Sequence, residues 1–113
     1  MINLDNLKNI SRHNSAFIRE ILEVYLTNTP QDLEKMGQAV DQEDWQIVRY
    51  FAHKLKSSSF TIGFDKGHRQ FQEIEHIIKN DQDKEEVPAL FNEAVVSCDE
   101  CIKAVKIELT KYI

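Results

Sequence analysis

The chain is poor in the residues that favour turns, with three glycines and two prolines among 113 residues. Sheet folds need a tight turn every few residues, and glycine and proline supply many of these turns. Their scarcity argues against a β or mixed fold and favours helices joined by short polar loops. The apolar fraction of 42% is ordinary for a folded domain, so the composition does not indicate disorder.

Long apolar runs are absent as well. No stretch approaches the length of about 20 apolar residues that a membrane-spanning helix needs. Residues Met1–Asp5 lack the charged and apolar regions of a secretion signal, so we expect a cytoplasmic location. The length suits one domain over residues 1–113, and the initial methionine favours a stand-alone protein.

Cysteine occurs twice, at Cys98 and Cys101, in a CxxC arrangement. A redox motif of this type belongs to a thioredoxin-like βαβ unit, and the surrounding pattern does not predict one. A zinc site would need two further ligands at a suitable spacing, and the sequence has no second CxxC pair. Both cysteines fall in an apolar helical stripe, which predicts buried core thiols.

The net charge of −5 argues against general nucleic-acid binding. The charges are unevenly distributed, because residues 49–72 contain five of the 14 basic residues and one of the 19 acidic residues. An acidic protein with one basic segment has a plausible docking face for an acidic or phosphorylated partner.

The first forty residues carry signals for three helices. Apolar spacing predicts a short helix over residues 2–10, and Asn14 or Ser15 can cap a second helix. The predicted inner face of the second helix consists of Phe17, Ile21, Val24, Tyr25 and Asn28. A new helix is then predicted to start at residues 29–32, because threonine caps, proline suits the first helical position and aspartate favours the positive helix end. Its apolar face contains Leu33, Met36 and Val40.

The central region predicts a longer helix from Asp41 or Gln42 to about Phe60. Its apolar stripe advances in steps of three and four residues, through Trp45, Val48, Ala52, Leu55, Ser59 and Ile62. Gly63 can end this helix in a left-handed conformation. Asp65 is then expected to cap the next helix, whose inner face contains Phe71, Ile74 and Ile78.

Polar residues 80–83 connect to a last helix, predicted from about Lys84 to near the C-terminus. Its stripe consists of Val87, Phe91, Ala94, Cys98, Cys101, Val105, Leu109 and Tyr112. Short connections between amphipathic helices make sequential helices antiparallel neighbours. We therefore predict an all-α fold, an antiparallel up-and-down four-helix bundle with short N-terminal capping helices.

The residues around His53 carry the strongest chemical signal. Leu55 faces the predicted core, so His53 lies just beside the buried stripe. Lys56 and Ser57 follow His53 by three and four residues, and Arg49 precedes it by four, so all three lie near it on the helix. Neutral imidazole is a good nucleophile near pH 7, and the neighbouring ammonium would meet the charge of a phosphoryl group on the ring.

Other interpretations of His53 are possible from the pattern alone. A histidine beside lysines on a helix more often belongs to a solvated face. The remaining histidines, His13, His68 and His76, are interpreted as surface residues. If His53 reacts through one ring nitrogen, the other needs an acceptor that fixes the tautomer, and a carboxylate or amide of the adjacent helix can provide it.

The segment around His53 resembles the signature of histidine phosphotransfer domains, His-x-Leu-Lys-Gly-Ser-Ser/Ala. The matching residues are His53, Leu55, Lys56, Ser58 and Ser59. The resemblance covers nearly the whole chain, with Phe17–Leu22 and Thr29-Pro30 before the motif, Asp44-Trp45 at the start of its helix, and Ile62-Gly63 and Ile74-Glu75 after it.

The resemblance implies a phosphoryl carrier between the aspartates of receiver domains, without kinase or phosphatase machinery of its own. Its implied partners are response-regulator receiver domains, including that of a hybrid histidine kinase, with no nucleic acid and no membrane. No cofactor is implied for the chain itself, because the receiver supplies the magnesium.

By position in the family motif, His53 carries the phosphoryl group and Lys56 stabilises its charge. Glu75 falls where the family often places a glutamine or glutamate near the imidazole, and Gln72, one turn earlier, is the other candidate acceptor. The alternative for Glu75 is an exposed helix charge without a role.

Candidate docking residues are Arg49, Lys54, Ser57 and Phe60, with a further apolar contact from Leu55. Phe60 either docks a partner or belongs to the core, and the sequence favours neither. Ser57 replaces a family glycine that lets a receiver backbone approach closely, so we expect altered docking rather than lost function.

Gly67 and Gln70 also depart from the family pattern, because leucines usually occupy these positions. The helix near Asp65 is therefore expected to start late or to pack loosely in its first turn.

Two other functions remain alternatives to the phosphoryl carrier. A helical interaction module that binds a receiver or kinase without taking phosphate predicts a buried or salt-bridged His53, or a Ser57 that blocks access. A metal or redox protein predicts that the cysteines and histidines converge on one point.

Overall fold

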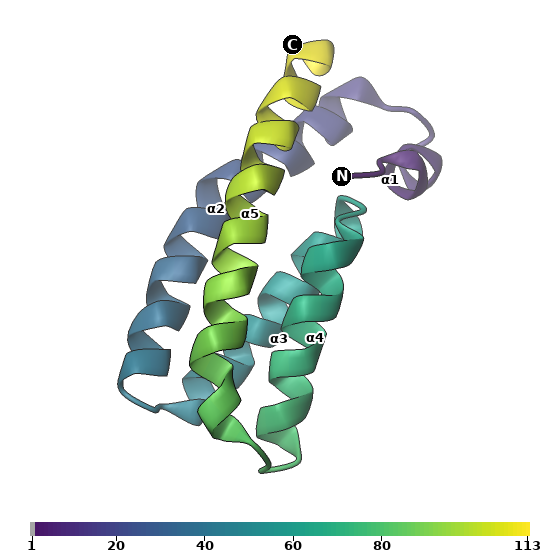
Figure 1. Cartoon of the computed structure of the whole chain (residues 1–113). Helices are drawn as coiled ribbons and strands as arrows, with labels where there is room; N and C mark the ends of the chain where they lie inside the picture. Colours follow the sequence, from purple (N-terminus) through teal and green to yellow (C-terminus); the bar gives the residue numbers. More distant parts are fainter. Residues whose placement is uncertain (1) are drawn as a thin grey trace.

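The computed structural model describes residues 2–113, which form five α-helices and two short 3-10 turns (Figure 1). The α-helices are α1 (Asp5–Ile10), α2 (Ser15–Asp41), α3 (Trp45–Thr61), α4 (Asp65–Lys79) and α5 (Val87–Leu109). The 3-10 turns are η1 (Lys84–Glu86) and η2 (Thr110–Tyr112), on either side of α5. Within residues 2–113 there is no strand, and no helix is both long and apolar enough to cross a membrane.

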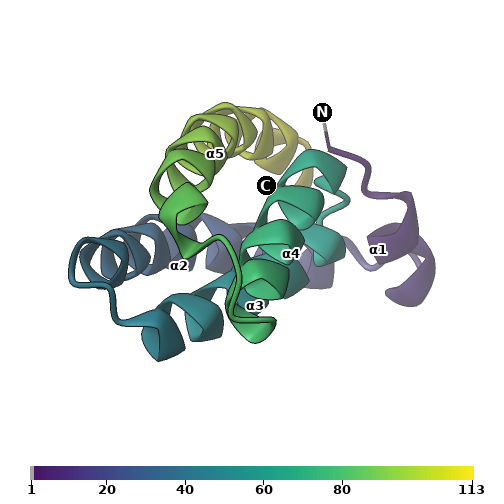
Figure 2. The same ribbon diagram turned by 60° about the horizontal axis from the view of Figure 1, so that its bottom comes forward.

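The four long helices surround a common core, and each runs antiparallel to the helix before it (Figure 2). α3 contacts α2 and α4, and α5 closes the bundle by contacting α4 and α2. The prediction of an all-α up-and-down bundle is confirmed. One short helix, α1, precedes the bundle in the described part of the chain, where the sequence predicted capping helices.

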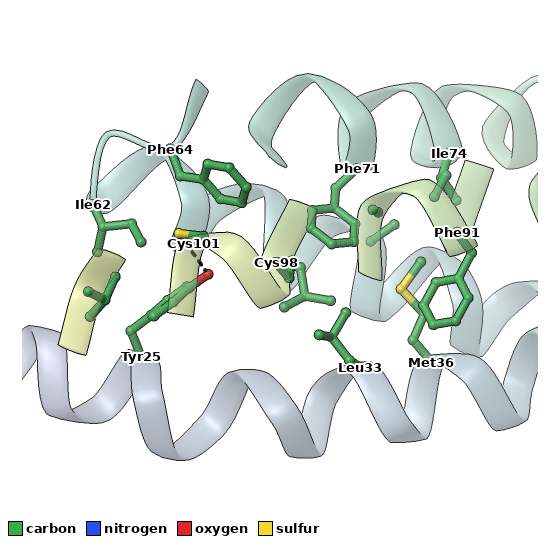
Figure 3. Close-up of a cluster of buried hydrophobic side chains, with 14 of the residues drawn as sticks. Tyr25, Leu33, Met36, Ile62, Phe64, Phe71, Ile74, Phe91, Cys98 and Cys101 are labelled. Carbon is green, nitrogen blue, oxygen red and sulfur yellow. Dashed lines mark hydrogen bonds between the residues drawn. The ribbon is translucent and has the colours of Figure 1, made fainter. Parts of the chain in front are cut away.

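The interior is built from apolar side chains of all four long helices, and Figure 3 shows part of it. Tyr25 of α2 donates its hydroxyl hydrogen to Sγ of Cys101 on α5, at 3.3 Å. Burial raises the pKa of the Cys98 thiol to about 12 and that of the Cys101 thiol to about 11, so both thiols stay protonated at neutral pH. The prediction that the cysteines are core residues is confirmed.

The predicted break at residues 29–32 is wrong, because α2 continues through Pro30. The predicted inner face was also displaced, since Phe17 and Val24 are exposed. The buried stripe has a helical spacing that runs unbroken across the proline, through Ile18, Leu22, Tyr25, Thr29, Leu33, Met36 and Val40. Pro30 itself faces solvent. Tertiary burial on both sides of the proline thus outweighs the cost of about 3 kcal/mol that proline imposes on a helix interior.

α3 begins at Trp45, later than the predicted start at residues 41–42. Glu43 adopts a left-handed conformation with φ 54°, which ends the preceding helix. The Asp44 carboxylate then accepts a hydrogen bond from the Ile47 N–H and caps α3. The predicted inner stripe of α3 is buried as expected, with Trp45 partly covered.

Gly63 ends α3 in the left-handed region, with φ 69°, as predicted. The N–H groups of Gly63 and Phe64 bond to the carbonyls of Phe60 and Ser59, which makes a complete Schellman motif. The N-terminal segment lies against this turn, where the Asn3 N–H donates to the Gly63 carbonyl at 3.1 Å. A β-carbon on Gly63 would lie 1.8 Å from the Asn3 carbonyl oxygen, so glycine is required there for two reasons.

The expectation that the next helix starts late is wrong. α4 begins at Asp65, which lies in its first turn instead of capping it, with Phe64 at the cap position. The fully buried Phe64 ring fills the space into which a side chain at position 67 would project. The aromatic residue and the glycine thus compensate for each other. On the inner face, Ile77 is buried and the predicted Ile78 only partly so.

The last helix starts at Val87, after the η1 turn over residues 84–86, and ends at Leu109. Its predicted stripe is buried from Val87 to Val105, whereas Leu109 and Tyr112 are partly covered near the end of the chain.

The Phe64–Gly67 contact predicts the sign of one stability change. In Gly67→Ala the new β-carbon would lie 2.4 Å from the Phe64 ring, which is fully buried. Overpacking costs about 1–3 kcal/mol and outweighs the gain in helix propensity, which is at most about 1 kcal/mol. We expect urea denaturation to show a lower free energy of unfolding. The exposed neighbour control, Lys66→Ala, should stay near wild type, and a Gly67→Ala variant as stable as wild type would contradict this account.

Candidate functional site

His53 projects from the middle of α3 at its junction with α4. The neighbouring Ala52 and Leu55 are buried, and they fix the helix against the core. The His53 side chain is 64% exposed, so solvent and a partner can reach the imidazole. A rigid helix therefore presents an accessible ring, as the position beside the stripe predicted.

The imidazole contacts α4 through one nitrogen. Nδ1 of His53 lies 2.7 Å from Oε2 of Glu75. A carboxylate can only accept, so Nδ1 carries the hydrogen and donates it. In the neutral ring this tautomer leaves the lone pair on Nε2, at the opposite side of the ring from Glu75. The arrangement provides an exposed nucleophile with a fixed tautomer.

Lys56 binds the other oxygen of the same carboxylate. Its Nζ lies 2.6 Å from Oε1 of Glu75, one helical turn after His53. The Glu75 side chain is 15% exposed, and although burial opposes ionisation, the hydrogen bonds and charges of Lys56 and His53 outweigh it and lower the Glu75 pKa. Glu75 is thus a charged acceptor that joins the imidazole and the ammonium.

Glu75 and not Gln72 is the acceptor for His53, and the alternative of an exposed, contact-free Glu75 is wrong. Gln72 is exposed and lines the surrounding groove. Sequence spacing could not choose between the two because both lie on the same side of α4, one turn apart.

The groove between α3 and α4 has a volume of about 950 Å³ and is open to solvent. It is lined by Gln46, Arg49, Tyr50, His53, Lys54 and Lys56 on α3 and by Gln72, Glu75, His76 and Lys79 on α4. Glu75 is the one acid in a lining with four lysines or arginines. The basic segment predicted from the sequence therefore forms part of a basic groove.

Four groove residues were not predicted from the sequence: Gln46, Tyr50, His76 and Lys79. A signal for them was available. Gln46 and Tyr50 precede His53 by seven and three residues, and His76 and Lys79 lie four and seven residues after Gln72, so each shares a helix face with a predicted site residue.

Lys54 lines the groove and also contacts α2. Its Nζ lies 3.0 Å from Oδ1 of Asp32, a carboxylate that is 8% exposed. This ion pair joins α2 to α3 beside His53, so Lys54 has a structural contact in addition to its predicted docking role.

Phe60 is 60% exposed, so the alternative that it belongs to the core is wrong. Ser57 is exposed one turn before it, whereas Leu55 is buried and cannot contact a partner. His68 is half-buried, so its interpretation from the sequence as a surface residue is wrong. Its Nδ1 lies 3.3 Å from the Lys56 carbonyl oxygen, and its ring centre lies 5.6 Å from that of Phe60. Ser57 and Phe60 thus form an exposed ridge after His53, and His68 of α4 packs against this part of α3.

The alternatives can be compared with this geometry. His53 is paired with a carboxylate, as a non-phosphorylated interaction module would predict, but the pairing occupies only Nδ1 and the ring is exposed. The two thiols lie in the core, between α5 and α2, on a different helix from His53. Within residues 2–113, no three His, Cys, Asp or Glu side chains gather as metal ligands would.

Two solved structures are similar over nearly the whole chain. The first is the HPT domain of a sensor hybrid histidine kinase from Shewanella, with 27% identity and a TM-score of 0.85, covering 97% of this chain and 94% of that one. The second is histidine-containing phosphotransfer protein B from Pseudomonas aeruginosa, with 19% identity and a TM-score of 0.81, covering 97% and 92%. This second likeness concerns the fold alone.

A comparison with curated proteins finds no match. The family model of the Hpt domain matches residues 20–110, a span that runs from α2 to the end of α5 and includes His53, Lys56 and Glu75. The chain therefore belongs to the Hpt domain family, and its general function is histidine phosphotransfer in phosphorelays.

Proposed function

We propose that this domain relays a phosphoryl group through His53 between the receiver-domain aspartates of a two-component phosphorelay. The observation that carries the proposal is the exposed imidazole whose Nδ1 is held by Glu75 at 2.7 Å. This contact directs the nucleophilic lone pair of Nε2 outward, where an aspartyl phosphate of a partner can be attacked.

The transfer step follows from this geometry. The Nε2 lone pair attacks phosphorus, the bond between phosphorus and the aspartate oxygen breaks, and its electrons return to the receiver carboxylate. The Nδ1 proton stays on the ring, where Glu75 accepts its hydrogen bond. Lys56 can turn from Glu75 to the phosphoryl oxygens, since a hydrogen bond to a charged group contributes roughly 1.5–3 kcal/mol.

The basic groove supports a receiver as the partner. Arg49 and Lys79 line it on opposite helices, beyond the Lys56–Glu75 pair. A receiver presents an acidic pocket around its phosphorylated aspartate, and opposite potentials favour encounter and orientation of two proteins. In this proposal the receiver holds the magnesium ion, and the domain supplies His53, Lys56 and the groove.

The exposed ridge of Ser57 and Phe60 would extend the docking face past the histidine. Serine adds a β-carbon where the family motif has glycine, but Ser57 is exposed and leaves His53 open. We propose that the serine changes the fit to particular receivers and not the capacity for transfer.

Replacement of His53 tests the proposal directly. In His53→Gln the nucleophilic nitrogen is lost, so we expect no uptake of label from a ³²P-labelled phospho-receiver with magnesium. The wild type should acquire acid-labile, alkali-stable label. His13→Gln, at an exposed histidine between α1 and α2, is the matched control and should be labelled normally. Equal labelling of the His53→Gln variant would refute the assignment.

Replacement of Lys56 tests the role of the ammonium group. Lys56→Gln should slow phosphoryl uptake by about ten- to a hundredfold, the effect expected from losing one charge-assisted hydrogen bond. Rapid-quench measurement of the labelled fraction gives the rate. Lys56→Arg should recover much of it because the charge is retained, whereas Lys66→Gln, at an exposed position at the start of α4, should match the wild type. Equal rates in wild type and Lys56→Gln would remove Lys56 from the mechanism.

A further inference from the structure

Glu75 carries a charge that fixing the imidazole tautomer does not require. A glutamine carbonyl can also accept a hydrogen bond from Nδ1. The Glu75 carboxylate lies 2.7 Å from Nδ1 and is 15% exposed, so little water separates its charge from the ring. Any change in the charge of the ring therefore changes its electrostatic interaction with the Glu75 carboxylate.

Phosphorylation changes the charge of the ring. When Nε2 is bonded to phosphorus and Nδ1 keeps its proton, the imidazole is cationic. In the onward step an aspartate oxygen bonds to phosphorus, the P–Nε2 bond breaks and its electron pair returns to Nε2, which leaves neutral imidazole. If Nδ1 has lost its proton, the same step must release imidazolate, which is a far poorer leaving group.

We propose that the negative charge of Glu75 retains the proton on Nδ1 of phosphorylated His53, so that the imidazole leaves as a neutral group at neutral and mildly alkaline pH. This inference rests on the proposed function, in which His53 carries the phosphoryl group. Glu75 acts through the ring and does not touch phosphorus, so it is a positioning residue whose charge also sets the protonation of the leaving group.

The other charges around the ring make this role necessary. Apart from the phenol of Tyr50 on α3, every other titratable or charged side chain that lines the groove is basic: Arg49, Lys54 and Lys56 on α3, and His76 and Lys79 on α4. On the α2 side, Asp32 is occupied by Lys54 at 3.0 Å. Basic neighbours disfavour a cationic ring, so Glu75 is the acid in the groove that offsets them. When Lys56 turns to the phosphoryl group, the undivided charge of Glu75 faces Nδ1.

The test is an NMR titration of the phosphorylated imidazole in the intact domain. Phosphoramidate supplies the phosphoryl group, so no receiver is needed, and the signal is assigned to His53 by its absence from His53→Gln. We expect Glu75→Gln, a nearly isosteric change, to lower the titration midpoint by about one pH unit, since a charge-assisted hydrogen bond is roughly twice as strong as a neutral one.

Two further variants separate charge from packing. Glu73→Gln makes the same chemical change at an exposed position of α4 outside the groove and should leave the midpoint unchanged. Glu75→Asp keeps the charge, so its midpoint should lie closer to wild type than that of Glu75→Gln. An unchanged midpoint in Glu75→Gln, or equal displacement in both Glu75 variants, would overturn the inference.

The experiments distinguish a failure of the proposed function from a failure of this inference. In that case the wild-type domain would take no phosphoryl group from phospho-receivers, whereas the phosphoramidate titration would still report on Glu75. A second readout needs the receiver: transfer from phosphorylated Glu75→Gln should begin to slow at a lower pH than transfer from the wild type. Identical pH profiles for the two proteins would contradict the inference.

Discussion

The geometry of the site at His53 depends on one carboxylate of α4 that binds two side chains of α3. Both oxygens of Glu75 are used, one by the imidazole of His53 and one by the ammonium of Lys56. This arrangement fixes the ring tautomer and joins α3 to α4 at the site. It also holds the Lys56 ammonium group close to the ring, with only the Glu75 carboxylate between them. Because the acceptor is charged, each bond is about twice as strong as a neutral one, and the geometry is correspondingly well defined.

The bundle provides the rigidity that such a site needs. α3 is held from inside by a continuous buried stripe and from the side by the Lys54–Asp32 pair, and its far end is closed by the Schellman turn at Gly63. Sites on packed helices hold their geometry better than sites on loops. The proposed relay depends on this rigidity, because in it the domain presents one nitrogen to two different partners in succession.

The charge distribution of the molecule has a related consequence. The chain has a net charge of −5, yet the groove at His53 is lined mainly by basic side chains. A local field of opposite sign to the rest of the surface directs an acidic partner to one face and opposes its approach elsewhere. In the proposed mechanism, the basic surroundings give the partly buried Glu75 a chemical effect beyond its two hydrogen bonds.

The sequence alone determined the features that depend on local periodicity and local conformation. These are the all-helical bundle, the inner stripe of α3, the left-handed turn at Gly63, the buried cysteines and the exposure of His53 beside its stripe. Tertiary contacts decided the rest. Four features depend on which helices pack together and on their relative positions along the bundle axis. These are the continuity of α2 through Pro30, the fit of Phe64 over Gly67, the choice of Glu75 over Gln72 and the pairing of Lys54 with Asp32. Residue spacing within one helix carries no information about these relative axial positions, because packing between helices sets them.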